Sequence, residues 1–336
     1  MIRYAIIGTG WITETFIGGA MGVAGMELGA VYSRSAEKGR SFADRFTAAA
    51  HGKHVPVYTD LQEMASSADI DAVYIASPNK LHYEQSRLFL QHGKHVICEK
   101  PITIHPEQLQ ELQALAGQKG LIYMEAIMMM HQPQLQPLKD AVARLGRIRT
   151  AHIDFSQLSS KYPAYLAGKN PNIFNPAFCT GALMDLGIYC IYLVLELFGK
   201  PQDMVIHSQF LESGADATGD ILMLYPDKHV SISYSKVGQN RLGSQIIGDE
   251  GTLTMDSISQ LTGMNLHGKD GSITPVWGDE EKNKLMGAEA RSFYELITEP
   301  EKNAERYSVY RQRAMEVCET LEALRRQAGI QFRENE

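Results

Sequence analysis

The chain has 336 residues, 44% of them hydrophobic, which is enough for two domains that each bury a core. Its 32 Lys and Arg against 39 Asp and Glu give a formal net charge of -7, spread without long blocks of one sign. These values exclude a single small domain and disfavour a nucleic-acid partner, which would need a basic surface.

The first third of the chain alternates short apolar runs with amphipathic segments, a pattern typical of βαβ units around a parallel sheet. The expected strands are Ile2–Ile7, Leu28–Tyr32, Ala72–Ala76, His95–Cys98 and Leu121–Met124. The expected helices are Trp11–Ala20, Ala36–Phe46, Leu61–Ser66, Lys80–Gln91 and Pro106–Gln118. We therefore predict an α/β domain over residues 1–125.

The remaining residues, 126–336, carry longer alternating segments separated by Gly, Asp and Asn turns. The expected strands are Arg149–Phe155, Met204–Phe210, Asp220–Leu224, Val230–Val237 and Ser244–Ile247. An apolar helix around Gly181–Phe198 and a charged one around Glu305–Arg326 are expected beside them. This pattern predicts an α+β substrate domain on a large, mostly antiparallel, open-faced sheet, with the active site in the crevice between the domains.

A glycine turn follows the first expected strand and opens the first helix, where backbone amides can hold a pyrophosphate. The turn contains Gly8, Gly10, Trp11 and Ile12, and Thr13 stands where a third glycine is usual. Such a turn also occurs without a nucleotide. Its place at the first strand–helix junction of a βαβ array favours a Rossmann dinucleotide site.

The second expected strand ends at Ser33-Arg34, where an NAD enzyme usually has a carboxylate for the ribose 2′-hydroxyl. Arg34 and Ser33, with Lys38 one helical turn later, instead offer donors and positive charge for a 2′-phosphate. The alternative is an ordinary solvated arginine. We predict NADP as the cofactor, with NAD less favoured.

Two more polar segments follow the third and fourth expected strands, at the sheet edge where α/β proteins bind ligands. They are Ser77-Pro78-Asn79 with His82, and Glu99-Lys100-Pro101. Pro101 favours an extended conformation at Lys100, so that this side chain can project from the sheet edge. On its own, Lys100 would usually be a surface charge, and His82 would usually be a helix-start residue. We assign Ser77, Pro78, Asn79, His82, Glu99 and Lys100 to the cofactor site.

In this order and spacing, the motifs resemble the Gfo/Idh/MocA family of oxidoreductases over nearly the whole chain. The resemblance implies that Lys100 is a catalytic or substrate-positioning residue beside the nicotinamide. A family element, Asp-x-Gly-x-His, appears as the segment from Asp185 to Tyr189, with tyrosine in place of histidine. That variant, with Met124-Glu125-Ala126, is similar to the branch of dimeric dihydrodiol dehydrogenases and NADP-dependent xylose dehydrogenases. The branch implies Lys100 and Tyr189 as the catalytic pair, oriented by Asp185.

The chemistry of these residue types agrees with such roles. Asp185 and Tyr189 are four residues apart and share one face of a helix. A phenol with a pKa near 10 is a poor base at neutral pH, and an adjacent ammonium such as that of Lys100 stabilises the phenolate. Without the family resemblance, Tyr189 would be interpreted as one more buried aromatic residue on an apolar helix.

We therefore predict an NADP-dependent oxidoreductase that moves a hydride between nicotinamide and a secondary alcohol of a sugar, polyol or vicinal diol. Met128 replaces an aromatic residue that the resemblance implies for dihydrodiol pockets, which makes aromatic substrates less favoured. Oxidation of an aldopyranose is narrowly the favoured example. One alternative is a glycosidase that retains NAD and oxidises its substrate transiently. The other is a non-catalytic sensor that binds dinucleotide, although such a sensor need not retain Lys100 and Tyr189.

Partners and compartment follow from weaker signals. No histidines and carboxylates converge at metal-ligand spacing, and the four cysteines form no Cys-x-x-Cys pair, so we expect no metal. The longest apolar stretch, Ile188–Phe198, is too short to span a membrane, and no signal peptide is recognised. A cytoplasmic protein is expected. An open-faced sheet tends to bury its free face in a homodimer or larger homo-oligomer.

Overall fold

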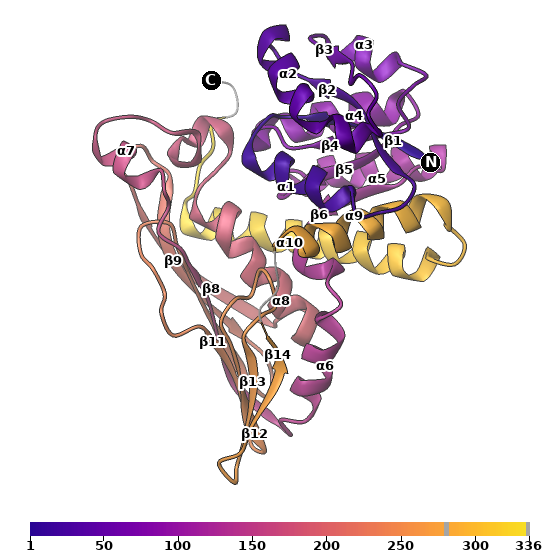
Figure 1. Cartoon of the computed structure of the whole chain (residues 1–336). Helices are drawn as coiled ribbons and strands as arrows, with labels where there is room; N and C mark the ends of the chain where they lie inside the picture. The colour runs from indigo at the N-terminus through magenta and orange to yellow at the C-terminus, as the bar shows by residue number, and fades with distance from the viewer. Residues whose placement is uncertain (279–281, 334–336) are drawn as a thin grey trace. The chain divides into compact units, whose positions relative to one another are not determined.

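The computed structural model describes residues 1–278 and 282–333. The described residues form two compact units (Figure 1). The first contains residues 1–131 and 282–315, and the second contains residues 132–278 and 316–333. Each unit is described on its own.

The first unit is a parallel α/β fold. Its strands are β1 (Ile2–Ile7), β2 (Met26–Tyr32), β3 (Val57–Tyr58), β4 (Ala72–Ile75), β5 (His95–Glu99) and β6 (Tyr123–Ala126). Its helices are α1 (Trp11–Ala20), α2 (Ala36–Ala43), α3 (Leu61–Ser66), α4 (His82–Gln91), α5 (Pro106–Lys119), α9 (Lys282–Thr298) and the first part of α10 (Ala304–Ala328). The strands pair in parallel in the order β3-β2-β1-β4-β5-β6. This order confirms the predicted Rossmann fold and places its switch point between β1 and β4.

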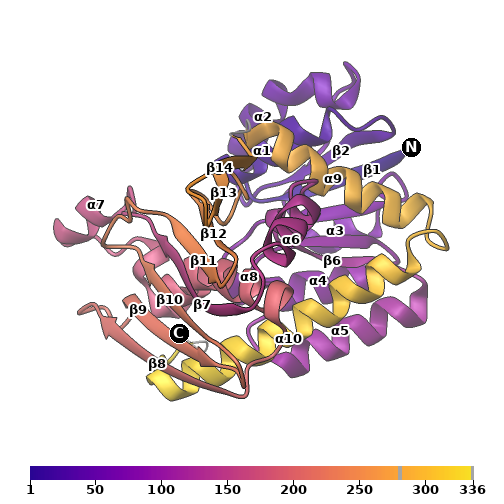
Figure 2. The ribbon, with the colours of Figure 1, turned by 90° about the horizontal axis from the view of Figure 1, so that it is seen from below.

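Helices cover both faces of this sheet, with α1 and α9 on one face and α4 and α5 on the other (Figure 2). The strands are therefore buried on both sides and read as near-continuous apolar runs. Beneath the glycine turn, the Phe16 ring of α1 stacks on Tyr74 of β4 at 3.9 Å between centroids, and Tyr4 meets Phe16 edge-on at 5.9 Å. These rings fix α1 against the two strands at the switch point.

The C-terminal part of the first unit differs from the predicted division at residue 125. Helix α9, which the sequence did not predict, packs along α1 although more than 260 residues separate them. The two backbones touch at Gly19, where a Cβ would lie only 2.6 Å from the Gly287 nitrogen. Each compact unit thus contains two separate stretches of the chain. The assignment of 1–125 and 126–336 as functional domains stays a prediction.

The second unit is built on one large sheet. Its strands are β7 (Ile148–Ser156), β8 (Asp203–Phe210), β9 (Asp216–Leu224), β10 (His229–Ser235), β11 (Ser244–Gly248), β12 (Gly251–Met255), β13 (Met264–Gly268) and β14 (Ile273–Trp277). Their order is β14-β13-β12-β11-β7-β10-β9-β8. The β7–β10 pair is parallel and the other pairs between these strands are antiparallel. The predicted mostly antiparallel sheet is confirmed.

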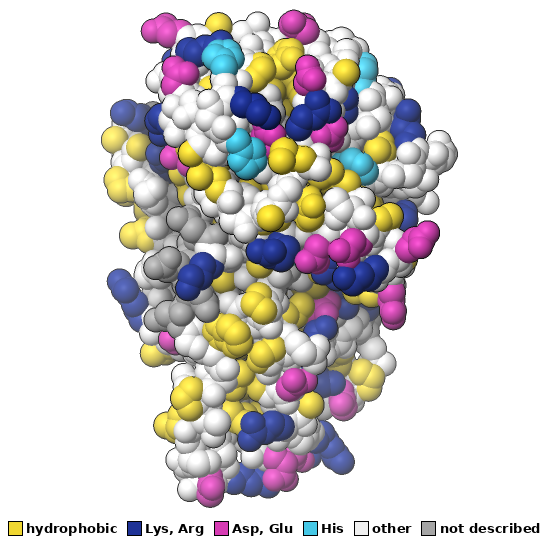
Figure 3. Space-filling view, turned by 45° about the vertical axis from the view of Figure 1, so that its right-hand side comes forward, with side chains coloured by type: hydrophobic (Ala, Val, Ile, Leu, Met, Phe, Trp, Pro, Cys, Tyr) yellow, Lys and Arg dark blue, Asp and Glu magenta, His cyan; other side chains and the backbone are white. Residues whose placement is uncertain are grey.

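Helices gather on one face of that sheet. They are α6 (Leu135–Ala143) and α8 (Ile188–Phe198), while the short α7 (Tyr162–Leu166) lies near one end of the strands (Figure 1). The other face carries alternate polar side chains of β7 and β10 and stays open within this unit, as expected for an open-faced sheet. On the face shown in Figure 3, acidic and basic side chains are interspersed, in keeping with the composition.

The apolar helix predicted around Gly181–Phe198 has two parts. A π-helical turn over Leu183–Gly187 leads directly into α8. The segment Pro176–Phe198 is long and apolar enough to cross a membrane by length and composition, but 83% of its most apolar window is buried in the fold, as in a core helix.

Candidate active site

The glycine turn lies at the carboxyl end of β1, beside the end of β4. Gly8 has a φ of +107°, and a Cβ there would lie 2.6 Å from the Ala76 carbonyl oxygen. Gly10 is the N-cap of α1 and gives the helix no side-chain cap. A Cβ on Gly10 would meet no described atom within 4 Å. The fold itself therefore requires glycine at position 8, whereas open space beside position 10 leaves room for a ligand against the first amides of α1.

Thr13, in place of the third glycine, is fully buried on the inner side of α1. Within the described residues its hydroxyl has no hydrogen-bond partner. The two residues before it, Trp11 and Ile12, begin the helix, and the Trp11 side chain is exposed. The helix start thus combines a buried threonine with an exposed aromatic at the turn.

The segment after β2 is held by short local bonds. The Ser33 hydroxyl accepts from the Ser35 N–H at 3.3 Å, and the Ser35 hydroxyl caps α2 by accepting from the Lys38 N–H at 3.4 Å. Gly39 lets α2 approach, because a Cβ there would lie 2.9 Å from the Ser33 Cβ. The side chains of Arg34 and Lys38 are exposed. Exposed positive charge therefore lies at the carboxyl end of β2, and the Ser33–Ser35 segment contains no carboxylate.

His82, the first residue of α4, links the two polar segments that follow β4 and β5. It is fully buried, and its two ring nitrogens lie 2.8 Å from the Ser77 carbonyl oxygen and 2.8 Å from the Pro101 carbonyl oxygen. Burial lowers the pKa of His82, with a further lowering by Lys100, against the raising effect of the two carbonyls. This geometry makes His82 a positioning residue for both loops, and a direct contact with the cofactor stays a prediction.

Glu99 and Lys100 end β5 at the same edge of the sheet. The Glu99 carboxylate accepts from the Tyr74 hydroxyl at 2.6 Å and from the Lys100 N–H at 3.3 Å. The Lys100–Pro101 peptide bond is cis. Glu125 of β6 accepts from the Ile102 N–H at 2.8 Å. The backbone around Lys100 is therefore fixed from both neighbouring strands, while its side chain is only partly buried.

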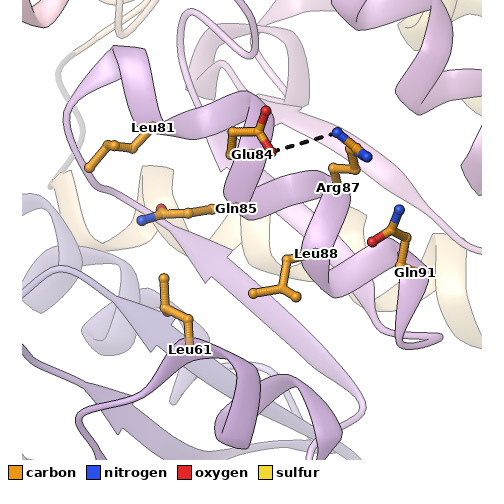
Figure 4. Close-up of a pocket in the computed structure, with 7 residues that line it drawn as sticks. All are labelled: Leu61, Leu81, Glu84, Gln85, Arg87, Leu88 and Gln91. Atoms are coloured by element: carbon orange, nitrogen blue, oxygen red, sulfur yellow. Dashed lines mark ion pairs between the residues drawn. The ribbon is translucent and has the colours of Figure 1, made fainter.

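A shallow groove of about 420 Å³ runs along α4 next to the Ser77 turn. Figure 4 shows that Leu61 of α3 and Leu88 of α4 line its apolar side, with Leu81 at one end. The Gln85 side chain lies between them, and its carbonyl oxygen accepts from the Ser77 hydroxyl at 2.7 Å. Gln85 of α4 thus lines the groove and also binds the turn that carries Ser77, Pro78 and Asn79.

Asp185 and Tyr189 stand out in the second unit. They are only partly buried, whereas every other residue from Cys179 to Leu195 is buried. The Tyr189 ring packs edge-on against Phe155 of β7 at 5.5 Å between centroids. Within this span, the partly exposed side chains are an aspartate and a tyrosine four residues apart, a pattern that favours a polar site at this point of the helix.

The sequence missed the partner of Asp185. Lys236 follows β10 directly, is 7% exposed and forms an ion pair with the Asp185 carboxylate. The turn is anchored a second time by Asp216 of β9, whose carboxylate accepts from the Leu183 N–H at 2.7 Å. The alternation of β10 places Lys236 on the same face as Tyr234, but pairing across 51 residues leaves no local signal.

The Rossmann order, the glycine turn and the polar residues at the strand ends are typical of a dinucleotide-binding protein. Two family models match the chain: "Oxidoreductase family, NAD-binding Rossmann fold" over residues 2–127 and "GFO/IDH/MocA C-terminal domain" over residues 136–254. The chain belongs to the Gfo/Idh/MocA family and is an NAD(P)-dependent oxidoreductase, as the sequence motifs predicted.

Named relatives extend over most or all of the chain. It is 37% identical over 332 residues to the scyllo-inositol 2-dehydrogenase (NADP(+)) IolU of Bacillus subtilis (strain 168), covering 99% of this chain and 98% of that protein. It is 28% identical over 262 residues to the trans-1,2-dihydrobenzene-1,2-diol dehydrogenase of Macaca fascicularis, covering 74% of this chain and 73% of that one. Both relatives are dehydrogenases of alcohol groups.

The fold is also that of a solved structure. A 3-ketoreductase from Actinomadura kijaniata, in complex with NADP and TDP-benzene, superposes with a TM-score of 0.81 at 21% identity. The match covers 97% of each chain. At this identity the likeness shows the fold alone.

Proposed function

We propose that the protein is an NADP-dependent dehydrogenase that oxidises a secondary alcohol of a cyclic polyol, sugar or vicinal diol. The observation that carries the cofactor choice is the exposed Arg34 at the end of β2, where no carboxylate of the Ser33–Ser35 segment can bind a ribose 2′-hydroxyl. A relative named as an NADP(+)-dependent inositol dehydrogenase, aligned over 99% of this chain, supports a cyclic polyol ahead of an aldopyranose.

The dinucleotide fits the residues at the carboxyl edge of the first sheet. The amides of the glycine turn suit the pyrophosphate, and Arg34, Ser33 and Lys38 suit the 2′-phosphate. The proposed contacts are Gly8, Gly10, Trp11, Ile12, Ser33, Arg34, Lys38, Ser77, Pro78, Asn79, His82, Glu99 and Lys100.

In the proposed mechanism, Tyr189 takes the hydroxyl proton of the substrate during oxidation and donates a proton to the developing alkoxide during reduction. The Lys100 ammonium stabilises the phenolate, and Asp185 orients the pair. The nicotinamide, when bound, supplies the hydride acceptor or donor. Proton transfer and hydride transfer thus fall to different groups, which lets one site work in both directions.

We also propose a homodimer or larger homo-oligomer through the open face of the second unit, and a cytoplasmic location. At the β8 edge, Val205 and Leu222 are paired across two strands and are 53% and 38% exposed. Neighbouring exposed apolar side chains on a sheet are typical of a surface that a partner covers.

The two glycines of the turn allow fold and binding to be separated. Gly8→Ala forces a Cβ against the Ala76 carbonyl at positive φ, so it is expected to lower the free energy of unfolding by roughly 2 kcal/mol and to weaken NADPH binding. Gly10→Ala meets open space and should leave stability nearly unchanged while it weakens NADPH binding. Urea denaturation and fluorescence titration measure the two effects. Unchanged NADPH affinity in Gly10→Ala would show that no ligand approaches this turn.

Arg34 gives the test of cofactor choice. The wild type is expected to bind NADPH more tightly than NADH in a fluorescence titration. Arg34→Ala should weaken NADPH binding about 10- to 100-fold, because charge-assisted bonds to the 2′-phosphate are lost, and should weaken NADH binding far less. Lys119→Ala, at the end of α5 and the opposite edge of the sheet, is the matched control. Tighter binding of NADH by the wild type contradicts the proposal.

The reaction is tested by NADPH formation from NADP across inositols, pentoses, hexoses and vicinal diols. Turnover of at least one class is expected, with cyclic polyols ahead. Release of free sugar from a glycoside without net NADPH formation would instead identify a glycosidase that retains its dinucleotide. Tight binding without any turnover would identify a sensor.

A further inference from the structure

Lys236 is a buried cation that the proposed mechanism does not use. Its side chain is 8% exposed, against 25% for its partner Asp185. Its backbone is fixed on both sides, since its N–H donates to the Ala217 carbonyl at 2.9 Å and its own carbonyl accepts from the Ser159 N–H at 2.9 Å. Removing an ammonium from water is unfavourable unless a carboxylate lies against it. The buried Lys236 ammonium therefore depends on the Asp185 carboxylate against it.

The ion pair joins the end of β10 to the π-helical turn that carries Asp185. A Cβ at Gly187 would come within 3.3 Å of the Tyr234 ring, so the turn lies directly on β10. Asp216 holds the same turn through the Leu183 N–H. Asp216 thus holds the turn two residues before Asp185, and Lys236 binds the Asp185 carboxylate itself.

Asp185, the acidic member of the ion pair with Lys236, lies one helical turn before Tyr189. A carboxylate at that spacing disfavours a phenolate, because two negative charges then lie close together. An ammonium against the carboxylate cancels most of that effect. We propose that Lys236 is a positioning residue that fixes Asp185 and neutralises its charge, and so sets the acidity of the Tyr189 hydroxyl. The catalytic meaning of this inference rests on the proposed function, whereas the electrostatic effect does not.

Other titratable groups of the second unit form an electrostatic network that reaches Lys236 through Asp216, and none of them is substituted in the test. They are Asp154 of β7, Cys190 of α8, Asp216 of β9 and Tyr234 of β10. Lys100, the cation assigned to the same reaction, is also unchanged in every variant. The variants therefore differ only at Asp185 and Lys236, and the shift in Lys236→Met includes the effect of Lys236 on the pKa of Asp216.

The experiment follows the titration of the Tyr189 hydroxyl by NMR of the full-length protein labelled with carbon-13 tyrosine. Tyr189→Phe identifies its signal among the 15 tyrosines. Lys236→Met should raise the midpoint by about half to one pH unit, because Asp185 loses its counter-ion. Asp185→Asn should lower the midpoint by a smaller amount, because Asp216 still faces Lys236. The double variant should return close to the wild-type midpoint.

Lys236→Arg restores the positive charge and should restore the midpoint, and the NMR spectrum shows directly whether each variant is folded. Shifts of the same sign in the two single variants, or no shift in either, would overturn the inference. If the protein turns over polyols, the pH of half-maximal kcat for oxidation should move with the midpoint. Opposite shifts in a protein without turnover would uphold the ion-pair inference and reject the proposed function.

Discussion

A Lys100→Met variant and a Tyr189→Phe variant are each expected to lower kcat by about 100- to 10,000-fold, the usual contribution of a positioned proton-transfer group. Methionine keeps most of the lysine volume without the ammonium that stabilises the phenolate. Phenylalanine keeps the ring that packs on Phe155 and removes only the hydroxyl. NADPH affinity should fall much less than kcat, since neither change removes the glycine turn or Arg34.

Steady-state kinetics with the best polyol and a separate NADPH titration measure these effects. Lys119→Met and Tyr162→Phe are matched controls, because they make the same chemical changes outside the assigned site, and kcat should stay within about twofold of the wild type. Combining the two active-site changes should lower kcat little further than either alone, as for groups that act as a unit. Full activity in both single variants would reject the assignment of Lys100 and Tyr189.

The sequence predicted the first unit well because its local signals were strong. The strand Ile2–Ile7 and the helix Trp11–Ala20 agree with β1 and α1 residue for residue, since an apolar run, a glycine turn and an amphipathic segment follow one another. The helix expected over Ala36–Phe46 ends at Ala43 and continues as a 3-10 turn. The two-residue β3 is too short to show any periodicity.

Fewer elements of the second unit were predicted from local sequence patterns. Strands β12, β13 and β14 were not among the predicted strands. Asp185 and Tyr189 were identified from a family pattern, and both are partly exposed in an otherwise buried span. The assignment of Lys100, Tyr189 and Asp185 as one catalytic group stays a prediction.

The partners of His82 and Lys236 could not be predicted from the sequence, because they depend on contacts between distant parts of the chain. His82 was assigned to the cofactor site, and its two ring nitrogens lie 2.8 Å from the Ser77 and Pro101 carbonyl oxygens, the second across 19 residues. Lys236 carried no motif at all. Both are polar groups whose partners become neighbours only through the sheet topology, and no periodicity in the chain encodes such pairs.

Asp216 gives a pH-dependent prediction of stability. It is fully buried, and burial raises the pKa of its carboxyl to about 6, although backbone N–H donors and Lys236 oppose this shift. One carboxylate oxygen accepts from Leu183, and the other has no hydrogen-bond partner in the described residues. Because the folded pKa lies above the ordinary value of 3.8, the folded state holds this proton more tightly than the unfolded state does.

The stability that Asp216 contributes is therefore fully present below about pH 4 and is lost as pH rises through about 6, a change of roughly 3 kcal/mol. Asp216→Asn keeps an oxygen for the Leu183 N–H but has no charge at any pH. The free energy of unfolding of the wild type minus that of Asp216→Asn should thus fall by roughly 3 kcal/mol between about pH 4 and pH 7. Urea denaturation at several pH values measures this difference, and Asp220→Asn, exposed on the same strand, should show little change. A difference for Asp216→Asn that stays constant with pH would mean that this carboxyl is solvated in the folded protein. Asp216 would then not anchor the turn that carries Asp185.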